Sequence, residues 1–195
     1  MIRRLLVETK LLHLEETKLA GVMIITPRRL SDDRGFFSES WNRQKLGACL
    51  GFDLDFVQDN HSLSRQVGTL RGLHFQVPPH AQAKLVYCSR GRLLDVAVDL
   101  RTGSPTFRHW VGVELSFANG KQLLIPEGFA HGFVTLDPDT EVNYKCSAYY
   151  SPAADRSIAF DDPDFGIDWG IKRADAVLSD KDANARRLSE IDNPF

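Results

Sequence analysis

The chain is poor in the residues and patterns that would tie it to a metal, an oxidising compartment or a membrane. Its three cysteines, Cys49, Cys88 and Cys146, lack the spacing of a metal-binding motif, so we expect reduced thiols that pack as small hydrophobic groups. No apolar run approaches the roughly 20 residues that a membrane-spanning helix needs. The opening residues interrupt their apolar positions with charge too early for a secretory signal, and the sequence therefore predicts a cytoplasmic protein.

An excess of positive charge is also missing. The formal net charge is −2, from 24 basic and 26 acidic residues, and no basic run stands out. This balance excludes the broad basic surfaces that bind nucleic acids through their phosphates, and we expect neither nucleic acid nor a membrane as a partner. The hydrophobic share of 43% and the length of 195 residues are typical of one soluble domain that folds without disulfides or a metal ion.

Short apolar or alternating stretches, separated by turn residues, follow one another from Val22 onward. This spacing predicts an all-β sandwich or barrel built from many short strands. In RLLDVAVDL, the side chains of Leu94, Val96 and Val98 fall on one face of the expected strand. The stretch EVNYKCSAYY places two tyrosines on one face if the strand is unbroken, so that both would point into one cavity.

Helical patterns are few. Residues 40–50 are the one good internal helix candidate, with Ser40 as the expected N-cap, and residues 180–191 are a weaker one. Residues 1–14 look like an N-terminal extension, followed by a single domain over residues 15–195.

Two histidines each end a strand-like run, His74 in GTLRGLHFQ and His131 in IPEGFAHGF. Imidazole, with an unperturbed pKa of about 6.5, takes up and returns protons near neutral pH. A lone histidine in a strand is often only a hydrogen-bonded structural group. The two together indicate a pocket that handles protons.

Three cations of the polar clusters, Arg34, Arg71 and Lys84, would suit a diphosphate if the fold brought them together. Guanidinium groups bind phosphate oxygens in pairs, and an ammonium adds a point charge. The sequence has neither a GxxxxGK[ST] loop nor a GxGxxG motif after a strand. We therefore expect side chains, not a glycine-rich loop, to hold a phosphorylated ligand.

Several polar motifs occur in a fixed order among the apolar strands: DDRGFFSES, FVQDNHS, GTLRGLHFQ, AQAKLV, DVAVDLRTGSPTF, IPEGFAHGF and the tyrosine strand. In content and order they closely resemble the dTDP-4-dehydrorhamnose 3,5-epimerase family, from about Glu16 to Leu188. The resemblance implies a cupin-type jelly roll, usually a homodimer, that needs no cofactor. It also implies inversion of C3 and C5 of dTDP-4-dehydro-6-deoxy-D-glucose on the way to dTDP-L-rhamnose.

The resemblance assigns roles to individual residues. His74 matches the family's general base, Asp182 the residue that orients this base, and Tyr144 the acid. Lys84 matches the lysine near the keto oxygen of the sugar. The other matched positions surround the nucleotide and the sugar, with the last of them stacking on thymine: Arg34, Glu39, Gln58, Asn60, Arg71, His131, Asp155 and Tyr150.

Three positions depart from the family pattern. The family often has arginine at the position of Tyr87 and glutamate at that of Asp155, which concerns the contacts to the nucleotide. Gly170 replaces a frequent proline after a tryptophan and indicates a local change in a loop. None of the three affects the residues that would carry out the chemistry.

The implied chemistry suits these residue types. C3 and C5 both flank the C4 ketone, so loss of either proton gives an enolate whose charge collects on the C4 oxygen. Neutral His74 can remove the proton while Asp182 stabilises the imidazolium, and Lys84 can stabilise the enolate. Inversion requires a proton from the opposite face. Tyr144 is the candidate donor, although a strand tyrosine can equally be structural.

Other functions remain open from the sequence. A metal-dependent cupin usually has an HxH pair, but Gln76 stands two residues after His74, so we expect no metal ion. A non-catalytic sugar-nucleotide binder would lack the base or the acid, and both are present. Enzymes that epimerise one carbon, or that isomerise the ketone between C3 and C4, are closer alternatives that the sequence separates poorly.

Overall fold

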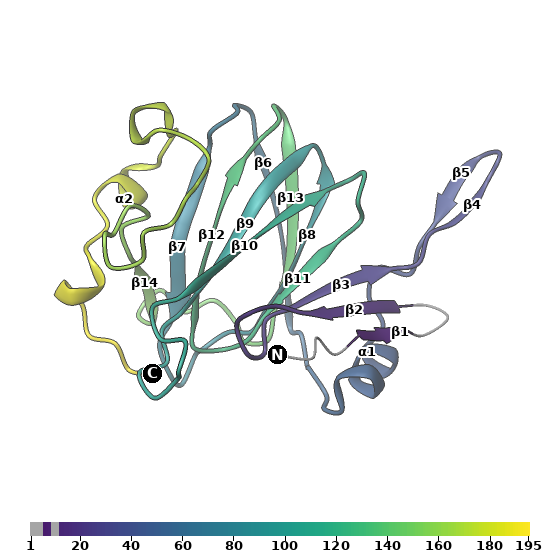
Figure 1. Cartoon of the computed structure of the whole chain (residues 1–195), viewed down its shortest axis with the longest axis horizontal. Helices are drawn as coiled ribbons and strands as arrows, with labels where there is room; N and C mark the ends of the chain where they lie inside the picture. The colour runs from purple at the N-terminus through teal and green to yellow at the C-terminus, as the bar shows by residue number, and fades with distance from the viewer. Residues whose placement is uncertain (1–5, 9–11) are drawn as a thin grey trace.

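The structure is a computed structural model, in which residues 6–8 and 12–195 are described. The described residues form two antiparallel sheets packed face to face (Figure 1). The first sheet has the order β1 (Leu6–Glu8), β2 (Leu12–Glu16), β3 (Met23–Pro27), β11 (Gln122–Ile125), β8 (Lys84–Arg90), β13 (Thr140–Cys146), β6 (Gln58–Ser64). The second has the order β10 (Trp110–Ser116), β9 (Arg92–Asp99), β12 (Phe129–Thr135), β7 (Leu70–Gln76), β14 (Asp155–Ser157). The all-β prediction is confirmed, and we call the two the seven-stranded and the five-stranded sheet.

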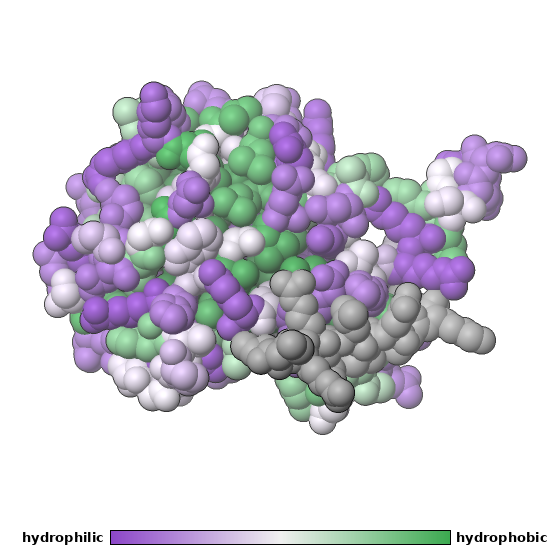
Figure 2. Space-filling view, in the orientation of Figure 1, coloured by the Kyte–Doolittle hydropathy of each residue, from purple (hydrophilic) through white to green (hydrophobic). Residues whose placement is uncertain are grey.

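A short hairpin projects from this body. It consists of β4 (Leu30–Asp32) and β5 (Gly35–Phe37), paired with each other and with neither large sheet. In the ribbon view it extends beyond the end of β3 as an arm (Figure 1). The space-filling view shows the same arm standing apart from the body, with hydrophilic residues at its tip (Figure 2).

Side chains of β9 alternate between two hydrophobic layers. Val96 and Val98 are fully buried against the C-terminal part of the chain, and Leu94 packs against the same cluster, so the predicted common face is confirmed. Leu93 and Ala97 point the other way, into the core between the two sheets. This alternation follows from the period of two in an extended chain.

The C-terminal segment covers the outer face of the five-stranded sheet. Phe160, Phe165, Trp169 and Leu188 are buried in the hydrophobic cluster that also contains the outward side chains of β7, β9 and β12. The Trp169 indole donates a hydrogen bond to the carbonyl of Phe160 at 2.8 Å, so its one polar atom is satisfied inside the cluster. This packing holds the following segment against β7 (Figure 1).

The helices are shorter than predicted. α1 spans Arg43–Leu50, and its N-cap is Asn42, not Ser40, because the Asn42 side chain accepts a hydrogen bond from the Lys45 amide. The expected helix over residues 180–191 is two short pieces, α2 (Asp180–Ala183) and a 3₁₀ turn, η2 (Leu188–Glu190), besides a further turn, η1 (Arg173–Asp175). The helix stops after α2 because the backbone of Arg186 pairs with Ile158 and Ala159 instead.

None of the described helices has the length and the apolar character that crossing a membrane requires. At the N-terminus, the boundary that we expected after residue 14 falls inside β2, which pairs with β3. Leu14 is fully buried. Residues 1–5 and 9–11 of the expected extension lie outside the described residues.

Two glycines allow β7 and β12 to approach each other next to the first histidine motif. Gly72 has φ +130°, and a Cβ placed on it would lie 2.5 Å from the Cα of Gly132. Another residue at this position would meet both backbone strain and a direct clash. The pairing register of the two strands shifts at the same point, and His74 becomes the direct neighbour of His131.

A buried carboxylate fastens the connection between β9 and β10. Asp99 is fully buried, and its two oxygens accept hydrogen bonds from the side chains of Arg101, Ser104 and Thr106. Burial alone would raise the pKa of Asp99, but these hydrogen bonds together hold it at about 2. The stabilisation is present above the unfolded pKa and is lost as the pH falls through the folded pKa.

Asp99→Asn should therefore lower the free energy of unfolding at pH 7 by about 2 kcal/mol. The difference from the wild-type protein should shrink as the pH is lowered from 4 towards 2, because the wild-type carboxylate is then protonated. Denaturant unfolding at several pH values measures both effects. An equal loss of stability at pH 7 and pH 2 would contradict this account.

Candidate active site

A cavity of about 330 Å³ opens between the two sheets, where β6 and β13 face β7 and β14. Polar side chains from both sheets and from α2 line most of it: Gln58, Asn60, His74, Phe75, Gln76, Gln82, Lys84, Tyr144, Cys146, Tyr150, Asp155 and Lys181. It thus brings together His74, Tyr144, Lys84, Gln58, Asn60, Tyr150 and Asp155, which the sequence had singled out.

His74 is tied to a buried carboxylate. Its Nε2 lies 2.6 Å from Oδ1 of Asp182, which comes from α2 and is 5% exposed. Burial tends to raise the pKa of Asp182, but hydrogen bonds from His74, Ser179 and the Gly72 backbone lower it overall. The carboxylate is therefore ionised and accepts the Nε2 proton, which leaves the lone pair of neutral His74 on Nδ1.

Tyr144 stands on the opposite sheet. It belongs to β13 of the seven-stranded sheet, whereas His74 belongs to β7 of the five-stranded sheet, and both line the cavity. Burial raises the pKa of the Tyr144 phenol, so the hydroxyl keeps its proton at neutral pH. Within the described residues, this hydroxyl has no hydrogen-bond partner, unlike that of Tyr150, which binds Asp155 at 3.2 Å.

Lys84 is a buried cation at the start of β8. It is 8% exposed, and it forms no ion pair within the part of the chain that the structure describes. Burial lowers the pKa of its ammonium, and the charges of Asp95 and Asp155 oppose this effect. A cation held in this way can stabilise a negative charge that develops on a ligand.

The mouth of the cavity is polar and structured. The carboxylate of Asp155 binds Lys181 of α2 at 2.5 Å as well as the Tyr150 hydroxyl. The Gln58 side chain accepts a hydrogen bond from the Tyr150 amide at 2.9 Å. Tyr150 is exposed, so its ring is free to contact a ligand. The expectation that Tyr144 and Tyr150 share a cavity is confirmed, although β13 already ends at Cys146.

Two further expected residues lie beside the cavity. Arg71 is exposed near the start of β7, where it donates hydrogen bonds to the Ser64 hydroxyl and the Leu63 carbonyl. His131 is 6% exposed and lies next to His74 on β12, with its Nε2 2.8 Å from Oδ1 of Asp95. Burial lowers the pKa of His131 despite the nearby carboxylate, so the ring is neutral.

Arg34 and Glu39 do not reach this cavity in their own chain. Arg34 lies in the turn of the projecting hairpin, where its side chain is 89% exposed and paired with Asp32. Glu39 follows the hairpin and binds Lys45 of α1 at 2.8 Å. The structure therefore brings only Arg71 and Lys84, and not Arg34, to the region where the sequence suggested a diphosphate site.

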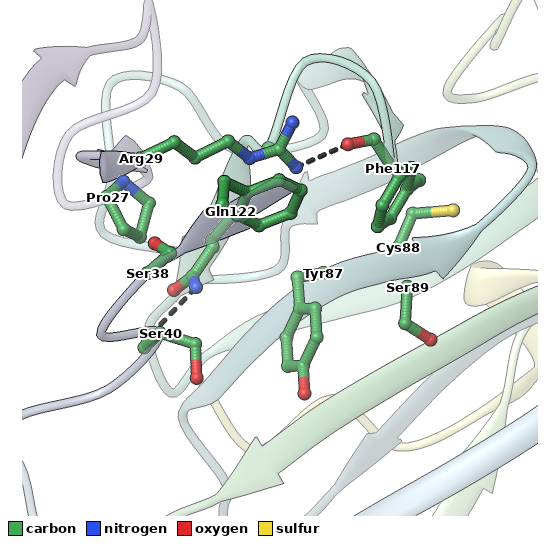
Figure 3. A pocket seen from close by; sticks show the side chains of 11 residues that line it. Pro27, Arg29, Ser38, Ser40, Tyr87, Cys88, Ser89, Phe117 and Gln122 are labelled. Carbon is green, nitrogen blue, oxygen red and sulfur yellow. Dashed lines mark hydrogen bonds between the residues drawn. The ribbon is translucent and has the colours of Figure 1, made fainter. Parts of the chain in front are cut away.

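A second hollow lies at the foot of the hairpin (Figure 3). The Arg29 guanidinium stacks over the rings of Phe36 and Phe117, and it donates hydrogen bonds to the carbonyls of Phe117 and Ala118. These contacts tie the hairpin to the turn after β10. Tyr87, where the family often has arginine, lines this hollow (Figure 3) and is not among the residues that line the main cavity.

Sequence reasoning missed several polar residues of the site, among them Gln76 and Gln82 of the cavity wall. Lys181 precedes Asp182 in the motif that we had quoted, and Cys146 follows Tyr144 by two residues on the same strand face. Asp95 is an acidic residue between the apolar Leu93 and Ala97 on the inward face of β9, and this position was the available signal. Among the described residues, no group of three or more histidine, cysteine or acidic side chains is arranged to hold a metal ion.

Comparison with known proteins shows which family has this arrangement. The family model described as dTDP-4-dehydrorhamnose 3,5-epimerase matches residues 16–190. The chain belongs to this family. A family member from Sinorhizobium fredii is 49% identical over 94% of this chain and 93% of its own. One from Salmonella typhimurium is 50% identical over 90% of this chain and 94% of its own.

A family structure supports the same assignment in three dimensions. The epimerase from Legionella pneumophila, solved in complex with dTDP-4-keto-L-rhamnose, superposes with a TM-score of 0.88 at 46% identity. The match covers 93% of this chain and 95% of the other. The cupin-type jelly roll that the resemblance implied is thereby confirmed.

Proposed function

We propose that the protein is a dTDP-4-dehydrorhamnose 3,5-epimerase, which converts dTDP-4-dehydro-6-deoxy-D-glucose into dTDP-4-dehydro-L-rhamnose. The observation that supports this most directly is the position of His74 and Tyr144 on opposite walls of one cavity. Inversion of a carbon needs a base on one face of the sugar and an acid on the other. A cavity with both groups on one wall would favour exchange without inversion.

His74 removes the proton from C3 or C5. Its Nε2 is held by Asp182, so the lone pair on Nδ1 is the basic position. The ionised carboxylate stabilises the imidazolium that forms, and it fixes the plane of the ring. Both carbons flank the same ketone, so one base serves them in turn.

Lys84 stabilises the negative charge that forms on the sugar when the base removes a proton. Removal of either proton leaves an enolate with its charge on the C4 oxygen, and a nearby ammonium stabilises this charge strongly in a site with little water. Tyr144 then donates its phenolic proton from the opposite wall, and the carbon is inverted. Its hydroxyl has no partner among the described residues, so no existing hydrogen bond is broken when it turns to the sugar.

The nucleotide occupies the mouth of the cavity. Exposed Tyr150 stacks on the thymine base, while Arg71 contacts the diphosphate. Four further residues contact the sugar or orient the side chains that contact it: Gln58, Asn60, His131 and Asp155. The product serves dTDP-L-rhamnose biosynthesis in the cytoplasm, and neither nucleic acid nor a membrane takes part.

The protein acts as a homodimer in which the hairpin reaches the cavity of the other copy. Arg34 and Glu39 match residues near the nucleotide, but they lie away from the cavity of their own chain. The arm also exposes apolar side chains that a second copy would cover, namely Leu30, Phe36 and Phe37. A twofold arrangement lets each arm complete the partner's site.

Proton exchange in deuterium oxide tests the reaction. Incubation with dTDP-4-dehydro-6-deoxy-D-glucose should place deuterium at both C3 and C5, and His74→Asn should abolish both exchanges. Arg71 and Tyr150 remain in that variant, so nucleotide binding should persist. Mass spectrometry and proton NMR count the exchanged carbons. Exchange at only one carbon in the wild-type protein would instead indicate a single-carbon epimerase. A product whose carbonyl has moved from C4 to C3 would indicate a ketoisomerase.

Tyr144→Phe tests the acid. Removal of the hydroxyl leaves the base and the cation in place, so the variant should still exchange substrate protons while forming the inverted product about 10²- to 10⁴-fold more slowly. Formation of the inverted product is measured by coupling it to the reduction of its 4-keto group. Exchange of the substrate protons is measured by NMR. Normal formation of product would make Tyr144 a structural residue and leave the donor among the other groups of the cavity.

Mixed dimers test the arm. Arg34→Ala and His74→Asn should each be poorly active alone. In a mixed dimer, the intact His74 of one chain meets the intact Arg34 of the other, so random mixing should restore about one quarter of wild-type activity. The subunits are mixed by refolding from denaturant, with each variant refolded alone as the control. No recovery in verified mixed dimers would show that Arg34 does not serve the partner's site.

A further inference from the structure

Asp95 is a buried carboxylate that the fold does not satisfy. It lies on β9, is fully buried, and points into the space between the sheets together with Leu93 and Ala97. Oδ1 accepts a hydrogen bond from His131, but Oδ2 has no partner among the described residues. Leaving an oxygen of a charged group unpaired inside a protein costs stability. Such a group is usually retained for function.

A matched residue on the same strand shows what a structural carboxylate looks like here. Asp99 is also fully buried, and both of its oxygens are satisfied by Arg101, Ser104 and Thr106. Asp95 has no such cation, because its hydrogen-bond partner, His131, is neutral. The two aspartates therefore differ in the one respect that matters: Asp99 stabilises a loop, and Asp95 carries a charge towards the interior.

The first consequence concerns His131. An ionised carboxylate can only accept a hydrogen bond, so Nε2 of the neutral ring carries the proton and Nδ1 carries the lone pair. His131 is the direct neighbour of His74 across β7 and β12. Its free nitrogen is thus a hydrogen-bond acceptor next to the base, suited to a sugar hydroxyl and unable to protonate the enolate.

The second consequence concerns Lys84. Burial lowers the pKa of its ammonium. Four titratable groups face it from the surrounding elements: Cys146 of β13, Asp95 of β9, Asp155 of β14 and Lys181 of α2. Burial raises the pKa of the Cys146 thiol, which is therefore uncharged at neutral pH. The charge of Asp155 is matched by Lys181, at 2.5 Å. Asp95 remains as the carboxylate whose charge no cation cancels.

We propose that Asp95 is a positioning residue of the epimerase site, which fixes His131 as a hydrogen-bond acceptor and keeps Lys84 charged beside the keto oxygen. It does not touch the substrate and acts through these two neighbours. The part that concerns Lys84 rests on the proposed function, because the proposed reaction forms the enolate that this cation stabilises. The part that concerns His131 is a property of the free protein.

Asp95→Asn tests the role of the charge with almost no change in shape. Loss of the carboxylate should lower the pKa of Lys84 further, because the remaining environment disfavours its charged form. The alkaline limb of kcat/KM, where the free enzyme loses an essential proton, should then move to lower pH by about one unit. At pH values above both alkaline limbs, the variant should be about tenfold slower than the wild-type protein. An unmoved alkaline limb would overturn the proposed effect on Lys84.

Asp99→Asn is the control. This residue is equally buried on the same strand, but it belongs to the loop before β10 and not to the cavity. The variant should be less stable, with the alkaline limb where it is in the wild-type protein. A similar shift in both variants would mean that Asp95 acts only through stability, and the proposal would fail.

The histidine tautomer gives a readout that needs no substrate. Nitrogen-15 NMR of the free wild-type protein should show His131 protonated at Nε2 alone, and Asp95→Asn should lose this single form because an amide can donate as well as accept. A proton on Nδ1 in the wild-type protein would overturn the assignment even if the variant did not fold. If the wild-type protein failed to epimerise the dTDP sugar, the proposed function would fall, while this spectrum would still test Asp95.

Discussion

The hydrogen bond between His74 and Asp182 holds the base of the site in place, and it depends on the packing of the C-terminal segment. His74 is on a strand of the five-stranded sheet, whereas Asp182 comes from a short helix near the end of the chain. The C-terminal segment reaches β7 because its aromatic side chains pack on the outer face of that sheet. A hydrophobic layer on the outer face of the sheet thereby places a carboxylate 2.6 Å from the base.

The sandwich supplies what an inverting enzyme needs, namely two walls with different chemistry. The five-stranded sheet contributes the base, and the seven-stranded sheet contributes the phenol and the buried ammonium. Burial shifts the pKa values of Tyr144, His131 and Lys84 in useful directions. It keeps Tyr144 protonated as an acid and His131 neutral, while it makes the charge of Lys84 depend on nearby carboxylates. The same low polarity that destabilises the lone cation makes it effective towards an enolate.

The cavity and the arm differ in how extensively the rest of the chain contacts them. Cavity residues are held by both sheets, so their positions follow from the core. Among the described residues, the arm makes few contacts with the body beyond the stacking of Arg29 on Phe36 and Phe117 at its base. Arg34 at its tip is nearly fully exposed. An arm that exposes apolar side chains is stabilised when a second protein surface covers them. This is the physical basis for the proposed dimer.

The sequence by itself determined the class of fold, the family and the types of group that do the chemistry. Short alternating stretches report a sheet because every second side chain is buried, and the ordered motifs identify the relatives. It misplaced the start of α1 by two residues, although the Asn42 cap is a local contact with Lys45. It overextended the second helix because the pairing of Arg186 with Ile158 depends on a contact distant in sequence. It also grouped Arg34 with Arg71 and Lys84.

Only the tertiary structure decided which of these residues meet. Linear order carries no information on whether Tyr144 faces His74, whether Arg34 lies on a separate arm, or whether Asp95 leaves one oxygen unpaired. These facts arise from the closing of two sheets around one space, in which residues more than a hundred positions apart, such as His74 and Asp182, come into hydrogen-bonding contact. Burial and charge at such contacts are properties of the folded chain, and no local pattern encodes them.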